Sequence, residues 1–340
     1  MVIVQNPTVG RINMQESNVK TTQINPHLEK KFRYPLNGEM VKSFSLPIVI
    51  LILFLFNSIF TDNFLAATTM WNILLHVSTT ALVAIGMTLV IATGGIDLSV
   101  GAVMAIGAVV STFLLDYNIF VIILGTIIIC ALIGLFNGAI ISYIGVQPIV
   151  VTLAIMIAGR GIAQVLTDGY LVSFSNPSYE WIGKGKIMEI PVPVILMFLV
   201  AITAFIIIRY MTFGRYIEAI GDNEQAAELA GINVKKIKMI VYIAAAVLAA
   251  LAGMIETARM AAADATRIGE LIELDAIAAV VVGGTLMTGG KPFIWGTVFG
   301  AILMGIISTT FNMNNIPYSY SLIIKAVIIV GAIYLQRANK

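Results

Sequence analysis

The sequence predicts an all-α, polytopic membrane protein with about ten transmembrane helices and both termini in the cytoplasm. Of its 340 residues, 59% are hydrophobic and only 11% are charged, whereas soluble domains carry about 25% charged residues. Hydrophobic runs of roughly membrane length follow one another from residue 43 to the end of the chain. Lysine and arginine residues gather in the segments that this arrangement places on one side of the membrane.

The N-terminal segment, residues 1–42, is polar and carries charges of both signs. It lacks the apolar core of a cleavable signal peptide, so we predict a cytoplasmic tail. Residues 43–340 are predicted to form one transmembrane domain. Its ten expected spans lie near residues 43–60, 77–93, 98–115, 119–143, 147–166, 189–208, 239–258, 274–290, 292–311 and 320–336.

The distribution of basic residues orients these spans. Six spans bring a cytoplasmic N-terminus back to the cytoplasm at Arg209, and four more leave Arg337 and Lys340 on the same side. The tail, residues 209–238 and the C-terminus together hold most of the 20 Lys and Arg residues, as expected for cytoplasmic segments. Residues 167–188 and 259–273 then lie outside. Tyr170, Tyr179 and Trp181 in the first of these loops belong either to an interfacial aromatic belt or to a surface for an extracytoplasmic partner.

The longest polar stretch within the hydrophobic part, residues 209–238, is predicted to be a cytoplasmic loop that contains a short helix. Asp222 followed by Gln225 matches a capping box, and Gly231 suits the left-handed position that ends a helix. A helix of about nine residues is marginal by itself in water, so we expect it to pack against something. It is either a solvated connector or a docking helix for a cytoplasmic partner.

Two glycine-rich turns interrupt the hydrophobic runs. The first comprises Gly94, Gly95, Asp97, Ser99 and Gly101. We predict that the Asp97 carboxylate caps the following helix; a direct part in gating or transport is the alternative, because carboxylates in or near lipid are often functional.

The second glycine-rich turn contains Gly283 and Gly284, and a Gly-Lys pair follows it at residues 290–291. It is not a phosphate-binding loop, because that pattern requires Ser or Thr after the lysine and Pro292 stands there. Two pairs of glycines spaced by four, Gly134 with Gly138 and Gly296 with Gly300, are typical of helices that pack closely in lipid.

Two cations, Arg160 and Lys325, fall within the expected spans. Long basic side chains usually extend to the membrane interface, which is the default interpretation of both. Arg160 lies between Gly159 and Gly161, well inside its span, and is the candidate for lining a pathway or pairing across helices.

The sequence predicts no catalytic, cofactor or metal site and no nucleic-acid partner. His27 and His76 lie far apart and the single Cys130 is within an apolar run, so metal-ligand spacing is missing. Neither an acid–base pair in a polar stretch nor a basic cluster with interleaved aromatics occurs. Such a chain suits a translocation body that receives its energy from another subunit.

Two sequence runs resemble the permease subunits of bacterial monosaccharide ABC importers of the ribose and galactofuranose type. They are residues 84–101 (AIGMTLVIATGGIDLSVG) and 273–284 (ELDAIAAVVVGG). Shorter matches include Gln147-Pro148, which leads to residues 158–161, and parts of residues 217–232. The resemblance extends from about residue 70 to the C-terminus.

The resemblance implies a multi-pass subunit of the plasma (inner) membrane that has no ATPase site of its own. It implies three protein partners in the surrounding lipid: a cytoplasmic ABC ATPase, an extracytoplasmic sugar-binding protein and a second permease chain, identical or related. The implied ATPase-coupling loop contains Glu218, Ala219, Gly221, Asp222, Glu224, Glu228 and Gly231.

Two other functions are alternatives. An ion-coupled secondary transporter of a small polar solute would need no ATPase, but the spans lack the run of carboxylates typical of such carriers. A membrane-embedded transferase acting on a lipid-linked substrate would need clustered Asp or His at one membrane face. Only the isolated Asp97, Asp116 and Asp275 are present.

Overall fold

The computed structural model describes residues 36–338, and the side chains of residues 46–334, as a helical bundle. The predicted tail, residues 1–42, lies almost entirely outside the described residues. Each of the ten predicted runs contains one helix: α1 (Leu36–Phe60), α2 (Ala67–Ala92), α3 (Val100–Phe113), α4 (Ile119–Ala139) with its π-helical extension η2 (Ile140–Ile144), α5 (Pro148–Leu166), α7 (Val192–Tyr210), α10 (Val234–Met260), α11 (Ile272–Val282), α12 (Ile294–Met313) and α13 (Tyr318–Ala338).

Among the described residues, six helices are long and apolar enough to cross a membrane: α2, α4 with η2, α5, α7, α10 and α12. Helices α3 and α11 have only 14 and 11 residues. At 1.5 Å per residue they extend about 21 and 16 Å, less than the roughly 30 Å of a bilayer core. The span expected at residues 274–290 was too long, because the helix ends at Val282 and glycine-rich turns follow it.

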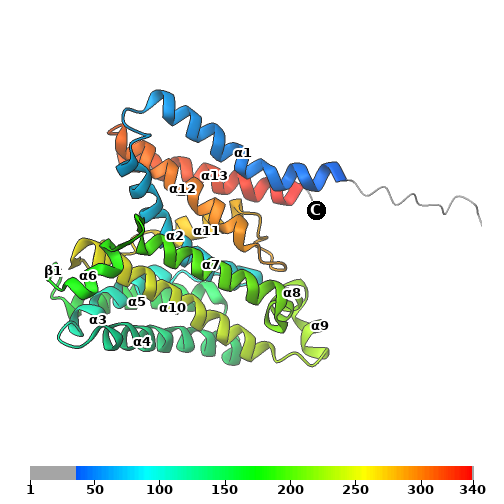
Figure 1. Cartoon of the computed structure of the whole chain (residues 1–340). Helices are drawn as coiled ribbons and strands as arrows, with labels where there is room; N and C mark the ends of the chain where they lie inside the picture. The colour runs from blue at the N-terminus through cyan, green and yellow to red at the C-terminus, as the bar shows by residue number, and fades with distance from the viewer. Residues whose placement is uncertain (1–35, 339–340) are drawn as a thin grey trace, which may run out of the picture. The chain divides into compact units, whose positions relative to one another are not determined.

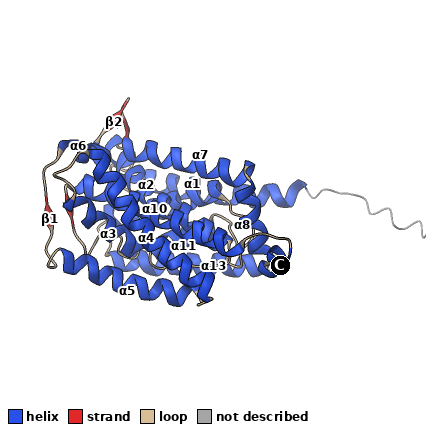
Figure 2. Ribbon diagram, turned by 90° about the horizontal axis from the view of Figure 1, so that it is seen from below, coloured by secondary structure: helices blue, strands red, loops and turns tan. Residues whose placement is uncertain are grey.

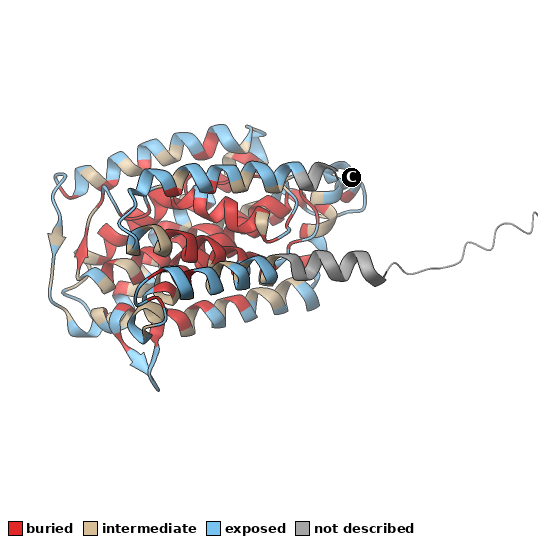
Figure 3. Ribbon diagram, turned by 90° about the horizontal axis from the view of Figure 1, so that it is seen from above, coloured by how far each residue is buried: buried red, intermediate tan, exposed pale blue. Residues whose placement is uncertain are grey.

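Helix α2 lies at the centre of the bundle, with α10 beside it. The most hydrophobic stretch of α2 is 83% buried, whereas those of α4 and α5 are only 22% buried. Figure 2 shows α5 and α7 along opposite edges with α2, α4 and α10 between them, and Figure 3 shows burial concentrated in the inner helices. The outer helices therefore present their apolar faces to lipid or to other membrane chains.

Small residues allow the inner helices to approach closely, as the paired glycines predicted. A Cβ atom on Gly134 would lie 2.6 Å from the Tyr242 carbonyl oxygen of α10, and one on Gly138 would lie 2.8 Å from the α-carbon of Met239. Gly300 is similarly pressed against the backbone of Ala279. These positions cannot carry a side chain without moving a backbone.

One end of the bundle carries short structures that join two loops. Strand β1 (Val172–Ser173) pairs with β4 (Ala262–Ala263), so the segments 167–188 and 259–273, both predicted to lie outside, are held together. Helix α6 (Pro177–Lys184) and the hairpin of β2 (Lys186–Ile187) and β3 (Ile190–Pro191) complete this end. Helices α8 and α9 lie at the opposite end (Figure 1).

The three aromatic residues predicted in the first of these loops do not share one environment. Tyr170 and Trp181 are exposed, in keeping with either predicted role. Tyr179 is fully buried, and its hydroxyl lies 2.7 Å from the Ser111 hydroxyl and 3.2 Å from the Met254 carbonyl oxygen. Both predictions were wrong for Tyr179, which anchors α6 to α3 and α10.

The two short helices, α3 and α11, begin beside each other in the interior. A Cβ atom on Gly101 would lie 2.6 Å from a carboxylate oxygen of Glu273, and Gly269, at φ +68°, contacts the Gly101 backbone. From there α3 leads to α6 through Ser111, whereas α11 ends where Gly283 packs on Gly296 at the start of α12. Two segments therefore run into the bundle from opposite ends, and each continues as a short helix, α3 or α11.

Candidate functional site

The predicted coupling loop folds as two short helices, not one. They are α8 (Thr212–Asp222) and α9 (Glu224–Leu229). Helix α8 is amphipathic: Ile217 and Ile220 are buried in a cluster with residues from the end of α2 and the start of α10 and α12. Glu218 and Ala219 are half-buried beside them. The loop is therefore packed on the transmembrane helices along α8.

The predicted capping box at Asp222 was wrong. Asp222 is the last residue of α8, and Asn223 caps α9 instead, its side-chain oxygen accepting the Ala226 N–H at 2.9 Å. Asn is as good an N-cap as Asp, and the helix break between α8 and α9 places it there. Gly231 does adopt the left-handed conformation, at φ +85°, as predicted.

Helix α9 leaves most of its surface free. Only Ala227 is buried, whereas Leu229 is 90% exposed and Glu228 is exposed beside it. Glu224 forms an ion pair with Lys238 of α10 at 2.6 Å, which fixes the start of α9. An exposed leucine next to a free carboxylate, on a helix tied down by its first turn, is the type of surface that a partner protein can bind.

Gly221 joins the coupling loop to both glycine-rich regions. A side chain on it would collide with the Ala92 carbonyl oxygen at the end of α2 and with the backbone of Gly290. The Gly290 N–H donates to that same Ala92 carbonyl at 3.0 Å, and a Cβ on Gly289 would lie 2.8 Å from the Gly221 carbonyl oxygen. Three chain segments thus meet backbone to backbone; we call Ala92, Gly221, Gly289 and Gly290 the glycine junction.

The first glycine-rich turn continues directly from this junction into the interior. Gly94 takes a left-handed conformation at φ +78°, and a Cβ on Gly95 would lie 2.5 Å from the Tyr242 hydroxyl oxygen. Asp97 is buried, and its carboxylate accepts the Ser99 N–H at 2.9 Å and the Ser99 hydroxyl at 2.5 Å. Ser99, not Asp97, is the N-cap residue of α3, and no side-chain cap bond is formed there, so the predicted capping by Asp97 was wrong. The Asp97 carboxylate instead closes the turn directly before the helix.

The buried network at this turn extends to α4. The Asn137 amide donates to the Ser99 hydroxyl oxygen at 2.8 Å, which the sequence patterns did not indicate. The second turn, at Gly283 and Gly284, lies at the start of α12 instead, where Gly283 contacts Gly296 and Gly284 has φ +99°. Of the residues of the first turn, Gly101 contacts the start of α11.

Arg160 binds backbone oxygens of the segment that precedes α11. Its guanidinium donates to the carbonyls of Ile268 at 2.6 Å, Gly269 at 3.0 Å and Ala265 at 3.2 Å. The side chain therefore joins α5 to the loop that precedes α11 rather than to a second helix, and it is held by backbone oxygens rather than by a carboxylate. These bonds fix residues 265–269 as they enter the bundle beside Gly101.

Lys325 does not extend to a membrane interface, and that expectation was wrong. Its ammonium lies 2.8 and 2.9 Å from the two carboxylate oxygens of Asp275, and both residues are buried. Asp275 looks isolated in the sequence because its partner, Lys325, is 50 positions away. The sequence did contain a signal for this pair. A lysine and an aspartate each fall within a predicted span, and charges inside a membrane usually pair because an unpaired one is costly.

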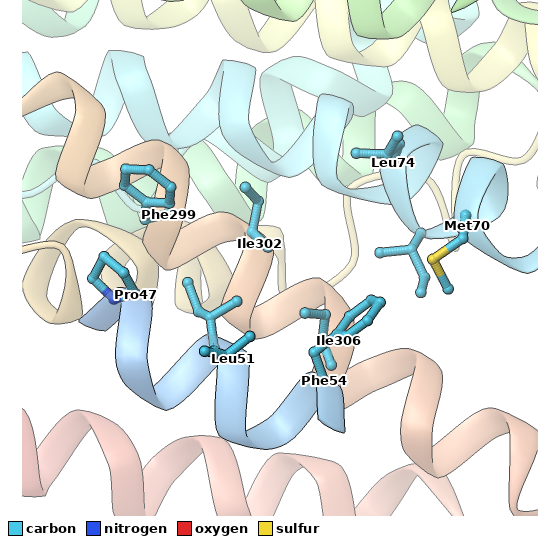
Figure 4. A pocket seen from close by; sticks show the side chains of 10 residues that line it. Pro47, Leu51, Phe54, Met70, Leu74, Phe299, Ile302 and Ile306 are labelled. Atoms are coloured by element: carbon cyan, nitrogen blue, oxygen red, sulfur yellow. The ribbon is translucent and has the colours of Figure 1, made fainter. Parts of the chain in front are cut away.

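A groove between α1, α2 and α12 is lined by apolar side chains. Its volume is about 360 Å³, and Figure 4 shows apolar side chains on all its sides: Pro47, Leu51, Phe54, Met70, Leu74, Phe299, Ile302 and Ile306. A polar solute would gain no hydrogen bond there to replace those it gives up in water. This groove suits an acyl chain of the surrounding lipid.

Comparison with known proteins agrees with these features. A family model described as "Branched-chain amino acid transport system / permease component" matches residues 69–333. The ribose import permease protein of Escherichia coli K12 is 40% identical over 299 residues, which cover 86% of this chain and 93% of that protein.

Two further relatives belong to other sugar systems. The galactofuranose transporter permease protein of E. coli K12 is 40% identical over 267 residues, 78% of each chain. The fructose import permease protein FruF of Bifidobacterium longum is 36% identical over 262 residues, 74% of each chain. Their names give no support to an ion-coupled secondary transporter. No solved structure matches the chain.

Proposed function

The chain belongs to the permease family of bacterial ABC importers, multi-pass subunits of the plasma membrane, and we propose that it translocates a monosaccharide. The sugar class is taken from the relatives, which are named for ribose, galactofuranose and fructose. In this proposal a cytoplasmic ABC ATPase supplies the energy, an extracytoplasmic binding protein delivers the sugar, and a second permease chain completes the pathway.

We further propose that both termini and the α8–α9 segment are cytoplasmic. The basic residues near α8, α9 and the end of α13 support this orientation. Ten membrane helices would then alternate across the bilayer, with α3 and α11 each crossing only part of it. Residues 1–42 would form a cytoplasmic tail, residues 43–340 the permease domain and residues 209–238 its coupling loop.

The observation that carries the proposal is the glycine junction. A force applied to α9 passes to Gly221 in the last turn of α8, and Gly221 lies directly against the backbones of Ala92 and Gly290. Ala92 leads through the first glycine-rich turn to α3, and Gly290 connects α11 with α12. Movement of one exposed helix would thereby shift both short helices that meet in the interior.

Co-purification from the native host tests this function. The tagged, detergent-solubilised chain is compared with Leu229→Asp/Glu228→Lys, which alters only exposed side chains of α9. Gln225→Ala is the matched control on the same helix, and Glu224 is left intact because of its ion pair with Lys238. We expect an ATPase to accompany the native chain and the control, and to be lost with the double variant. A folded chain that brings down no ATPase would refute the proposal.

A further inference from the structure

A polar cavity of about 140 Å³ lies between five helices, beside the segment that leads from β4 into α11. It is distinct from the apolar groove of Figure 4 and from the glycine junction. Helices α2, α10, α11, α12 and α13 each contribute at least one hydrogen-bonding side chain to its wall: His76, Glu256, Asp275, Ser308, Asn312 and Lys325.

Two of these side chains lack partners within the described residues. The Ser308 hydroxyl makes no hydrogen bond although the residue is only 6% exposed. Glu256 forms neither a hydrogen bond nor an ion pair in that part of the chain, while its neighbour across the cavity, Asp275, is satisfied by Lys325. Buried polar groups usually find partners, because leaving them unmet costs free energy. The cavity therefore presents unused hydrogen-bonding capacity to whatever enters it.

The lining of the cavity carries the carboxylates of Glu256, Glu270 and Asp275 and one ammonium, that of Lys325, which already pairs with Asp275. This excess of negative charge disfavours an anion. The described residues contain no group of three potential metal ligands, so they do not form a metal site there. A neutral molecule with hydroxyl groups fits the lining, because a hydroxyl can donate to the Glu256 carboxylate and can also accept a hydrogen bond.

We infer that this cavity binds the hydroxyl-bearing edge of a neutral monosaccharide; the inference rests on the proposed function and adds a sugar site within the single chain. A volume of 140 Å³ equals about five waters at roughly 30 Å³ each. That suits several hydroxyl groups, whereas a drug-sized ligand fills about 300 Å³ or more. The rest of the sugar extends past Glu270 and Tyr318, which line the cavity and are exposed.

The position of the cavity links it to the moving parts of the proposal. Asp275 lies in the first turn of α11, directly after the segment that Arg160 holds. The other end of α11 leads to the glycine junction through residues 283–290. A sugar held against Asp275 and Glu256 is therefore bound to a helix that the coupling loop can displace.

Direct binding tests the inference. The full-length chain, purified with its ATPase but without the binding protein, is titrated with radiolabelled ribose, fructose and galactose in separate experiments. Glu256→Gln removes the charge while keeping the shape, and Ser308→Ala removes an unpaired hydroxyl. Ser142→Ala removes a similarly unpaired hydroxyl outside the cavity and is the matched control.

We expect one sugar to bind, with about tenfold weaker binding for Glu256→Gln because a charge-assisted hydrogen bond is lost. Ser308→Ala should weaken binding by less, and Ser142→Ala should leave it unchanged. If the native complex with its binding protein imports a sugar but both cavity variants bind and import it normally, the cavity holds only water and the inference fails alone. If the native complex imports no monosaccharide, the proposed function fails and the inference fails with it.

Discussion

The Lys325 ammonium on α13 lies 2.8 and 2.9 Å from the two carboxylate oxygens of Asp275 on α11. Neither residue is more than 9% exposed, so the pair links two helices in an environment that screens charges poorly. Each charge is tolerated because the other is present. The stability of the protein should therefore fall strongly when one member of the pair is removed and much less when both are replaced.

We predict that Lys325→Met lowers the free energy of unfolding by about 3–5 kcal/mol, because it leaves the Asp275 carboxylate buried without a counter-ion. The double variant Lys325→Met/Asp275→Leu should regain most of that loss. Thermal unfolding of the purified chain measures both effects. Lys186→Met is the control, since its 3.6 Å contact with Glu189 is exposed and contributes little. A double variant as unstable as the single one would contradict the prediction.

Gly221→Ala should abolish sugar uptake while the chain still inserts into the membrane. The added methyl group meets the Ala92 carbonyl and the Gly290 backbone, neither of which can turn aside as a flexible side chain would. Gly161→Ala is the matched control, because a Cβ atom there has nothing within 4 Å. Uptake and stimulated ATP hydrolysis are measured at equal amounts of membrane-inserted protein. Normal uptake by Gly221→Ala would remove the junction from the mechanism.

Arg160→Gln should loosen the chain before α11. Its three hydrogen bonds to the carbonyls of residues 265, 268 and 269 disappear, and an amide is too short and offers too few donors to replace them. Hydrogen exchange of the amides in residues 264–271 should become faster. Arg267→Gln, in the same segment but largely exposed, is the control and should change little. Unchanged exchange in Arg160→Gln would show that other contacts hold this segment.

Much of this fold could be predicted from local patterns. The ten hydrophobic runs each mark a helix, and the paired glycines at 134 and 138 mark a close crossing, because both signals depend only on neighbouring residues. The length of α11 was overestimated although a local signal was present: Gly284 takes φ +99°, a conformation that glycine favours where a helix ends, and Gly283 packs on Gly296 of α12. The hydrophobic run, on which the prediction of residues 274–290 was based, continues past both glycines.

The parts of the candidate site that could not be predicted are formed by residues that lie far apart in the sequence. The hydrogen bond from the Ser99 N–H to the Asp97 carboxylate joins near neighbours in the sequence, whereas the bond from Asn137 to Ser99 spans 38 positions and follows no sequence period. The polar cavity combines one or two polar side chains from each of five helices, so each looks like an isolated polar residue in its helix. Charges within predicted spans are the only local trace of such sites.

The hydroxyl of Tyr179 should contribute measurably to anchoring α6. It is buried, 2.7 Å from the Ser111 hydroxyl and 3.2 Å from the Met254 carbonyl oxygen, so it connects α6 to α3 and α10 at once. Tyr179→Phe keeps the ring in place but removes the hydrogen bond, which should cost about 1 kcal/mol of unfolding free energy. A lower thermal midpoint of the purified chain is the expected result.

A variant of Ser111, which bonds the Tyr179 hydroxyl, distinguishes the loss of this hydrogen bond from a general packing defect. The Ser111 hydroxyl also donates to the Ala108 carbonyl at 2.6 Å, so it retains a partner in Tyr179→Phe. The double variant Tyr179→Phe/Ser111→Ala should lose less unfolding free energy than the two single variants lose together, because each single variant already removes the hydrogen bond that the two residues share. Tyr170→Phe, whose side chain is exposed, is the control and should leave the midpoint unchanged. Full additivity in the double variant would mean that the hydroxyl of Tyr179 acts on α6 through Met254 alone.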